Sequence, residues 1–430
     1  MRIRSLVLAV AVFTFTICAD NWPEWRGPTR DGVTKEKNVP VKWSATENIK
    51  WKTPLPDRGN STPIVWGNRI FVTQAVEKNG NRNLMCFDRK DGKLLWEKGV
   101  VWAEKEKSHE TNPQCSPSPA TDGERVVAWF GSAGLHCYDL DGKELWKRDL
   151  GRQEHEWGYA SSPIIFKDQI FLNFGPGTNS AVMAFDKKTG KTAWQVPVTE
   201  RHYKERNDGF KGQGTGYTGS FSTPIVIHTD NGDEVIVSLP DKIQALNPAT
   251  GKEIWSCQGM NPLIYTSTVF GEGVIVASGG FTGPDIAVKP GGKGDVTTTH
   301  KLWEGERTQN RLGSCVIKEG YAFFNSMPGI VECRELKTGK KVWDQRLREK
   351  GAKADTWSSL VLAGDNIYLL NQAGETVIFK ARPQFEFVGI NLLPDEHTNS
   401  SPVVSDGDIF IRTDENLYCI GQTTQTASRF

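Results

Sequence analysis

Two histidine–glutamate pairs have side chains that could support acid–base or metal chemistry. They are His109–Glu110 and His155–Glu156. Imidazole and carboxylate groups ligate zinc and transfer protons. Neither pair has the H-E-x-x-H spacing of a zinc hydrolase, and the chain contains no G-x-S-x-G nucleophile motif. We therefore expect polar loop residues at both places, with metal binding as the alternative.

A glycine-rich pattern, G-x-G-x-x-G, spans Gly214–Gly219. A dinucleotide site needs a strand before this pattern and a helix after it, because the helix N-terminus holds the pyrophosphate. Here the pattern leads into Phe221–Val226, an apolar segment typical of a strand. The glycines therefore indicate a flexible loop.

Aromatic and polar residues of the long connecting segments are the better candidates for a binding site. Loops on a rigid scaffold usually carry binding residues, whereas packing of the loops against the scaffold is the structural alternative. The candidate partner-binding residues are Arg58, Asn60, His155, Trp157, Tyr159, Tyr217, Trp357 and Asn399.

The composition excludes some partners for these residues. The chain has 430 residues with 52 Lys+Arg and 51 Asp+Glu, a net charge of +1. A nucleic-acid binder would normally carry a basic surplus, so we expect no nucleic-acid partner. The 24% of charged and 37% of hydrophobic residues suit a soluble globular chain.

The N-terminus predicts export. Arg2 and Arg4 precede an apolar run, Leu6–Ile17, that is too short to span a bilayer and typical of a signal peptide. We expect cleavage after Ala19, which places the mature protein in the periplasm or outside the cell. Lipidation of Cys18, giving a lipid anchor, is the alternative. No later apolar stretch is long enough for a membrane span.

Seven cysteines remain after that cleavage. Four lie in alternating apolar segments and should be buried thiols. The sequence leaves open a disulfide among Cys115, Cys257 and Cys315.

The elements that position all these residues form a repeat. A tryptophan follows a turn glycine at an offset of four residues, as in Gly142 and Trp146 or Gly190 and Trp194. The tryptophans assigned to the repeat are Trp51, Trp96, Trp146, Trp194, Trp255, Trp303 and Trp343. We interpret them as structural.

Each repeat opens with small polar residues and a short strand, such as Ser61-Thr62-Pro63 or Ser400-Ser401-Pro402. A two-residue turn such as Asp406-Gly407 follows. Units of roughly 50 residues with four short strands each predict an all-β, eight-bladed β-propeller of four-stranded antiparallel blades, with seven blades as the alternative.

The two ends of the chain predict how the ring closes. The last unit stops after Leu417–Ile420 without a tryptophan strand, while Ile49–Lys52 supplies a spare one before the first unit. The N-terminal strand should therefore complete the last blade. The expected division is a signal peptide (1–19), an N-terminal extension (20–47), the propeller (48–421) and a C-terminal tail (422–430).

The Gly-Lys-x-x-Trp unit ends and Ser-Ser-Pro unit starts resemble the quinoprotein-like, or PQQ-like, β-propeller repeat. The resemblance covers Ile49 to Ile420, and the opening Trp22–Pro28 is similar to exported bacterial members. These include the propeller subunit of the outer-membrane assembly machinery, a scaffold without chemistry. In this superfamily the repeat tryptophan packs between blades, so the resemblance specifies fold and leaves function open.

Quinone-dependent dehydrogenases share the repeat but typically add adjacent cysteines and calcium ligands, and this chain has no adjacent cysteines. We therefore expect no catalytic, cofactor or metal residues, with PQQ and calcium disfavoured. The resulting hypothesis is an exported, monomeric, non-catalytic scaffold that binds protein partners through its long-loop face. The alternatives are an enzyme or a carbohydrate-binding protein with a pocket at the channel mouth, and then a PQQ-dependent dehydrogenase.

Overall fold

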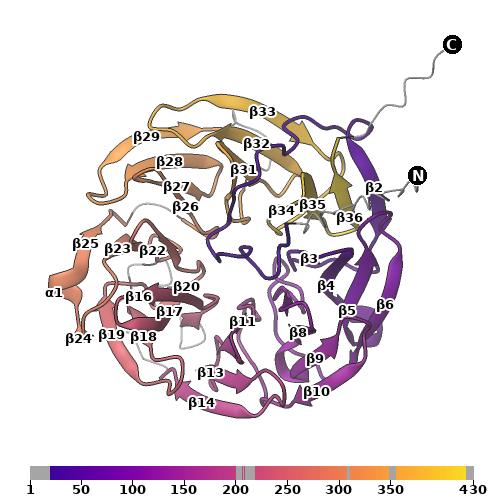
Figure 1. Cartoon of the computed structure of the whole chain (residues 1–430), viewed down its shortest axis with the longest axis horizontal. Helices are drawn as coiled ribbons and strands as arrows, with labels where there is room; N and C mark the ends of the chain where they lie inside the picture. The colour runs from indigo at the N-terminus through magenta and orange to yellow at the C-terminus, as the bar shows by residue number, and fades with distance from the viewer. Residues whose placement is uncertain are drawn as a thin grey trace, which may run out of the picture.

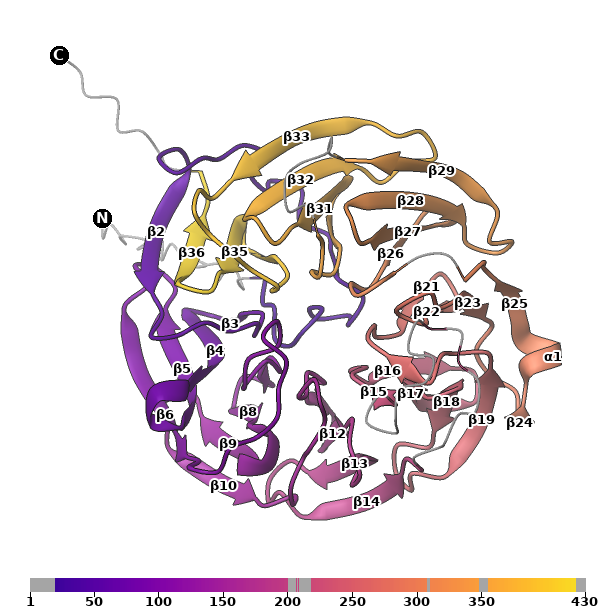
Figure 2. The ribbon, with the colours of Figure 1, turned by 180° about the vertical axis from the view of Figure 1, so that it is seen from behind.

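The structure is a computed structural model that describes residues 20–199, 206, 208, 218–307, 310–347 and 355–422. Within these residues, eight blades surround a central axis, each with four antiparallel strands that follow one another outwards from the axis (Figures 1 and 2). A ninth, two-stranded sheet pairs β15 (Gly219–Ser220) in parallel with β20 (Leu263–Ile264). The chain therefore forms an eight-bladed β-propeller, as the repeat predicts.

The first four blades are β3–β6 (Ile64–Trp66, Arg69–Val76, Asn81–Asp88, Leu94–Val101), β7–β10 (Ala120–Thr121, Arg125–Trp129, Leu135–Asp139, Glu144–Arg148), β11–β14 (Ile164–Phe166, Gln169–Phe174, Ala181–Asp186, Thr192–Pro197) and β16–β19 (Ile225–Thr229, Gly232–Leu239, Lys242–Leu246, Glu253–Gln258). The next three are β21, β22, β23 and β25 (Val269–Gly271, Val274–Ser278, Asp285–Val288, Lys301–Glu304), β26–β29 (Val316–Lys318, Tyr321–Ser326, Ile330–Glu335, Lys341–Arg346) and β30–β33 (Val361–Ala363, Asn366–Leu370, Glu375–Lys380, Phe387–Leu392).

The last blade combines the two ends of the chain. Its inner strands are β34–β36 (Val403–Ser405, Asp408–Arg412, Asn416–Ile420), and its outer strand is β2 (Ile49–Pro54). In this blade Trp51 pairs with Cys419, and its ring lies 6.1 Å from that of Phe410. The predicted closure by an N-terminal strand is confirmed. Because the ring is closed, every blade has a neighbouring blade on each side.

The repeat tryptophans join neighbouring blades. Trp146 Nε1 donates a hydrogen bond to the Lys187 carbonyl at 3.0 Å, in the turn of the next blade. Its ring lies against Gly190, whose φ is +68° and where an added Cβ would come within 2.5 Å of the ring. Only glycine suits this position, since it adopts positive φ without strain and lets the indole approach the backbone. The other tryptophans that donate to a carbonyl of the following blade are Trp51, Trp96, Trp194, Trp303 and Trp343.

Trp255 departs from this arrangement. Its Nε1 donates to Glu234 of its own blade at 2.8 Å, and its side chain is fully buried. In the next blade, a longer segment, residues 289–300, replaces the short turn between the third and fourth strands and contains β24 (Gly294–Asp295) and α1 (Thr297–His300). Strand β24 pairs with β19 at Trp255, and Val296, which follows β24, lies in the same buried cluster as the indole.

A ring of hydroxyl groups joins the blades near the axis. At seven of the eight blade junctions, the amide of the residue that opens one blade donates to the Ser or Thr hydroxyl that opens the next, for example Ser162 to Thr223 at 2.9 Å and Ser359 to Ser401 at 2.9 Å. Among the described residues, the junction between Thr62 and Ser118 is the exception. We call these opening residues the hydroxyl ring: Thr62, Ser118, Ser162, Thr223, Ser267, Ser314, Ser359 and Ser401. All eight residues are buried.

The segment before β2 crosses the centre of the ring, where its indigo trace passes in front of several blades (Figure 1). Its β1 (Val33–Thr34) pairs with β30, and Trp22 forms a β-bridge with Val65 of β3. Arg26 donates to the Leu360 carbonyl at 2.6 Å, and Arg30 to the Ile165 carbonyl at 2.9 Å. The segment therefore bridges blades on opposite sides of the axis.

The seven cysteines among the described residues are buried and free. The three whose pairing the sequence leaves open, Cys115, Cys257 and Cys315, therefore form no disulfide here. In the part of the chain that the structure describes, no helix is long and apolar enough to cross a bilayer.

Candidate binding site at the propeller axis

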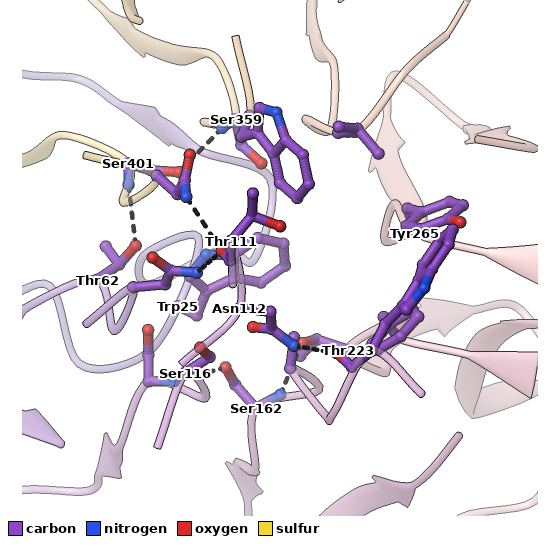
Figure 3. Close-up of a pocket in the computed structure, with 18 of the residues that line it drawn as sticks. Trp25, Thr62, Thr111, Asn112, Ser116, Ser162, Thr223, Tyr265, Ser359 and Ser401 are labelled. Carbon is purple, nitrogen blue, oxygen red and sulfur yellow. Dashed lines mark hydrogen bonds between the residues drawn. The ribbon is translucent and has the colours of Figure 1, made fainter. Parts of the chain in front are cut away.

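A cavity of about 500 Å³ lies at the axis of the ring. Its lining comes from the inner ends of several blades, from the long loops and from Trp25 of the N-terminal segment (Figure 3). The volume falls within the usual range of about 300–1,000 Å³ for small-molecule sites.

One side of the cavity is polar. Five members of the hydroxyl ring that accept an amide hydrogen also line this space: Thr62, Ser162, Thr223, Ser359 and Ser401. Because neighbouring backbones hold their oxygens in place, these hydroxyls form a rigid polar surface.

The opposite side is aromatic. Tyr265 stacks on Phe221 with ring centroids 5.7 Å apart, and Phe281 packs edge-on against Tyr265 at 5.2 Å. Trp157 lies 5.6 Å from Tyr265 and completes the aromatic wall, as we call these four residues. Figure 3 shows Tyr265 across the cavity from Thr62 and Ser401. A ligand in the cavity would therefore meet the aromatic wall on one side and, on the other, hydroxyls together with Trp25.

His155 lies behind the aromatic wall rather than in the cavity. It is buried, its ring packs edge-on against Phe221 at 5.5 Å, and its Nδ1 accepts the amide hydrogen of Trp157 at 3.3 Å. Burial lowers the pKa of His155 to about 4, so the imidazole is neutral at pH 7. Its role in this structure is to support Trp157 and Phe221.

The loops that border the cavity are tied to each other. Asn112 donates to the Trp157 carbonyl at 2.6 Å. Two ion pairs between the same loops, Lys107–Glu156 and Arg152–Glu104, each span 2.6 Å. These exposed pairs add little stability alone, but together with the partly buried Asn112–Trp157 hydrogen bond they hold the two loops against each other.

Asn60 and Asn399 line the axial cavity, and Arg58 lies next to them; all three precede the innermost strands of their blades. Asn60 and Asn399 both donate to the Thr111 carbonyl, at 2.8 and 3.1 Å, and Arg58 donates to the Glu110 carbonyl at 2.8 Å. They also line a second cavity of about 400 Å³ next to the first. The long loop 102–119 is thereby attached to both the first and the last blade.

The remaining candidates have different surroundings. Trp157 and Trp357 line the axial cavity. Tyr159 is buried in the core between two blades, where its hydroxyl accepts the Cys115 amide hydrogen at 3.1 Å and its ring packs on Trp129. Tyr217 lies outside the described residues.

Several lining residues were not predicted from the sequence. Trp25 belongs to the segment assigned as an extension, Tyr265 follows a strand with no repeat signal, and the serines and threonines were interpreted only as strand openings. The recurrence of a hydroxyl residue at one position of every unit was the signal that could have identified the ring.

The described lining can be tested against a calcium-bound quinone, the cofactor that the resemblance to quinone-dependent dehydrogenases would imply. Calcium takes six to eight oxygen ligands, with carboxylates prominent among them. The described lining offers one carboxylate, Asp208, which already pairs with Arg206 at 2.7 Å. No group of three or more metal-ligating side chains occurs within the described ranges. The residues described here do not fit this cofactor.

Comparisons with known proteins agree on the fold. The chain is 25% identical over 340 residues to the 1-butanol dehydrogenase (quinone) of Thauera butanivorans, a match that covers 73% of this chain and 47% of that protein. The chain thus spans about half the length of the curated relative it matches.

Two solved structures are similar at low identity. BamB from Moraxella catarrhalis has a TM-score of 0.58 at 13% identity, covering 86% of this chain and 98% of that one. The quinohemoprotein alcohol dehydrogenase of Comamonas testosteroni has a TM-score of 0.69 at 13% identity, covering 95% and 82%. At this identity both show the shared propeller fold alone.

The family comparison is more specific. The family described as outer membrane protein assembly factor BamB matches residues 32–178 and 178–429. Because these two matches together take in nearly every strand of the ring, this chain belongs to the family described as outer membrane protein assembly factor BamB.

Proposed function

We propose that this chain is an exported, non-catalytic scaffold that binds a protein partner through the loops around the mouth of the axial cavity. The observation that carries the proposal is the mutual attachment of loops from different blades. Asn112 of one loop holds Trp157 of another, and Lys107–Glu156 spans the same gap. A surface ordered before binding loses less conformational entropy when a partner arrives.

The family supports a scaffold role, and the location follows from the predicted signal peptide at residues 1–19. We propose the periplasm or the exterior as the location, with lipidation of Cys18 as the alternative to a free N-terminus at Asp20. We further propose that the protein is a monomer without a nucleic-acid partner, in keeping with its net charge of +1.

An oxidoreductase that uses a quinone is the second candidate function, favoured by the 1-butanol dehydrogenase relative. A ligand would have to enter the axial cavity, which is large enough for an organic cofactor. The composition of the described lining argues against this candidate, because it provides a single, already paired carboxylate for calcium.

Site-specific photocrosslinking in the native host tests the scaffold proposal. A photoreactive residue would replace Glu156, which is exposed on the long-loop face, or Lys188, which is exposed in a tight turn at the far end of its blade. We expect a discrete protein adduct from position 156 and none from position 188. Identical adducts from both positions, or none from position 156, would contradict the proposal.

A further inference from the structure

The hydroxyl ring has unused hydrogen-bonding capacity inside the axial cavity. A hydroxyl group has one donor and two acceptor positions. The oxygens of Ser162, Ser359 and Ser401 each accept one amide hydrogen, at 2.9–3.0 Å. Thr62 and Thr223 do the same. Each of the five therefore keeps one O–H donor and one lone pair that no described residue engages.

This capacity matches one class of ligand particularly well. An alcohol also both donates and accepts, so several alcohol groups on one molecule can satisfy both halves of several ring hydroxyls. A carboxylate would leave the free lone pairs unused, and an ammonium group would leave the O–H donors unused. Buried polar groups left without partners cost free energy, so the ring favours a polyol over either ion.

The opposite side of the cavity fits the same ligand. A pyranose ring carries hydroxyls at its edge and C–H groups on its faces, and those faces pack on aromatic rings. In the aromatic wall, the Tyr265 ring packs against those of Phe221 and Phe281, with centroid distances of 5.7 and 5.2 Å. Trp157 adds a fourth ring next to Tyr265.

The charge of the described lining is consistent with a neutral molecule. Its one carboxylate, Asp208, makes a two-pronged contact with Arg206 at 3.0 and 2.7 Å, and both side chains are buried. A second, unpaired charge entering this space would lose its hydration without a described counter-ion.

We propose that the axial cavity is a binding site for a neutral monosaccharide or disaccharide. The five ring hydroxyls that line it (Thr62, Ser162, Thr223, Ser359 and Ser401) would bind the sugar hydroxyls, and the aromatic wall would pack on a sugar face. The inference goes beyond the proposed protein scaffold and does not depend on it. A scaffold that contacts protein through its loops can also hold a sugar at its axis. Each of the two proposals can hold without the other.

The ring itself supplies a matched pair of variants for the test. Ser359→Ala removes the acceptor of the Ser314 amide, and Ser314→Ala removes the acceptor of the Ser267 amide, so both lose one equivalent buried contact. Only Ser359 lines the cavity. The two variants should therefore lose the same amount of unfolding free energy but differ in their affinity for the sugar.

Calorimetric titration of the full mature protein would use glucose, galactose, N-acetylglucosamine, maltose and cellobiose, with glucuronate as the charged comparison. We expect saturable binding of at least one neutral sugar in the millimolar range or tighter, and weaker binding of glucuronate. Ser359→Ala should lower the affinity for the sugar about tenfold, which is the effect of one ordinary hydrogen bond. The affinity of Ser314→Ala should stay within about twofold of wild type.

Three outcomes would overturn the proposal. They are no binding of any neutral sugar in the panel, equal binding of glucuronate, or equal losses of sugar affinity in the two variants. The last result would show that any sugar binds elsewhere. None of these outcomes affects the crosslinking result at position 156, so the two proposals fail separately.

Discussion

The backbone amide of Ser401 donates to Oγ1 of Thr62 at 3.0 Å, across 339 residues of chain. This contact joins the last blade to the first in the same way that Ser162 and Thr223 join two blades that are consecutive in the chain. The last and first blades are thus joined by the same hydroxyl contact that joins other neighbouring blades, in addition to the N-terminal strand β2 that completes the last blade.

The Thr62 hydroxyl should therefore contribute to the free energy of unfolding, because it accepts the hydrogen of a buried amide in the last blade. Thr62→Val keeps the shape but leaves the buried Ser401 amide without its acceptor, which should cost about 1–3 kcal/mol in the free energy of unfolding. Thr268→Val is the matched control, because Thr268 is fully buried and its hydroxyl has no hydrogen-bond partner among the described residues. Urea denaturation measures both, and equal effects would contradict the role of this contact.

The glycine that receives a repeat tryptophan should tolerate no side chain. Gly190→Ala places a Cβ within 2.5 Å of the Trp146 ring at φ +68°. Gly67→Ala changes a turn glycine at φ +55° that faces open space, and so shows the backbone strain alone, about 1–2 kcal/mol. We expect Gly190→Ala to lower the free energy of unfolding clearly more than Gly67→Ala, as measured by thermal or urea unfolding. Similar losses would mean that the close contact with the Trp146 ring does not contribute to the cost.

The fold could be predicted because its rules are local. The turn glycine before each tryptophan strand, as at Gly190 and Trp194, sets both a positive φ and a strand start, and those requirements recur in every regular unit. Trp255 shows where this reasoning stops. The indole has a different hydrogen-bond acceptor because a longer segment in the next blade takes the place of the short turn. No local sequence pattern predicts which side chain accepts the indole hydrogen.

The candidate site could be predicted only in part, since it depends on how loops pack after the ring closes. Asn60 and Asn399 were found because they precede innermost strands, which fixes their distance from the axis. Tyr159 and His155 stand in a long loop like Trp157, yet both are buried, and burial of a loop side chain depends on distant residues such as Phe221. Trp25 reaches the axis only because its segment crosses the ring.

Buried His155 should make stability depend on pH. Its pKa is lowered by burial to about 4 in the folded protein, against about 6.5 when unfolded. Between these values the unfolded state binds the proton and the folded state does not, so stability is full above pH 6.5 and falls as pH decreases towards 4. The expected loss is about 3 kcal/mol.

His155→Gln removes the titrating group, so its unfolding free energy should change less over this pH range than that of the wild type. Urea denaturation at several pH values between 4 and 7 measures the difference. Parallel curves for the two proteins would show that His155 is not the group responsible.

The cysteines should be unreactive in the folded protein. Burial raises the pKa of the Cys115 and Cys315 thiols to about 12, and a thiol rather than a thiolate is a poor nucleophile. Ellman's reagent should therefore label none of the seven described cysteines under native conditions and all seven in denaturant without reductant. Fewer than seven in denaturant would reveal a disulfide.

Binding without redox catalysis is the central claim, and calorimetric titration of the purified mature protein with PQQ in the presence of calcium tests it most directly. The described lining supplies Asp208 as its one carboxylate, already paired with Arg206. We predict no saturable heat of binding. Saturable binding at micromolar concentrations, accompanied by dye-linked oxidation of an alcohol or a sugar, would contradict the account and identify the chain as a quinone-dependent enzyme.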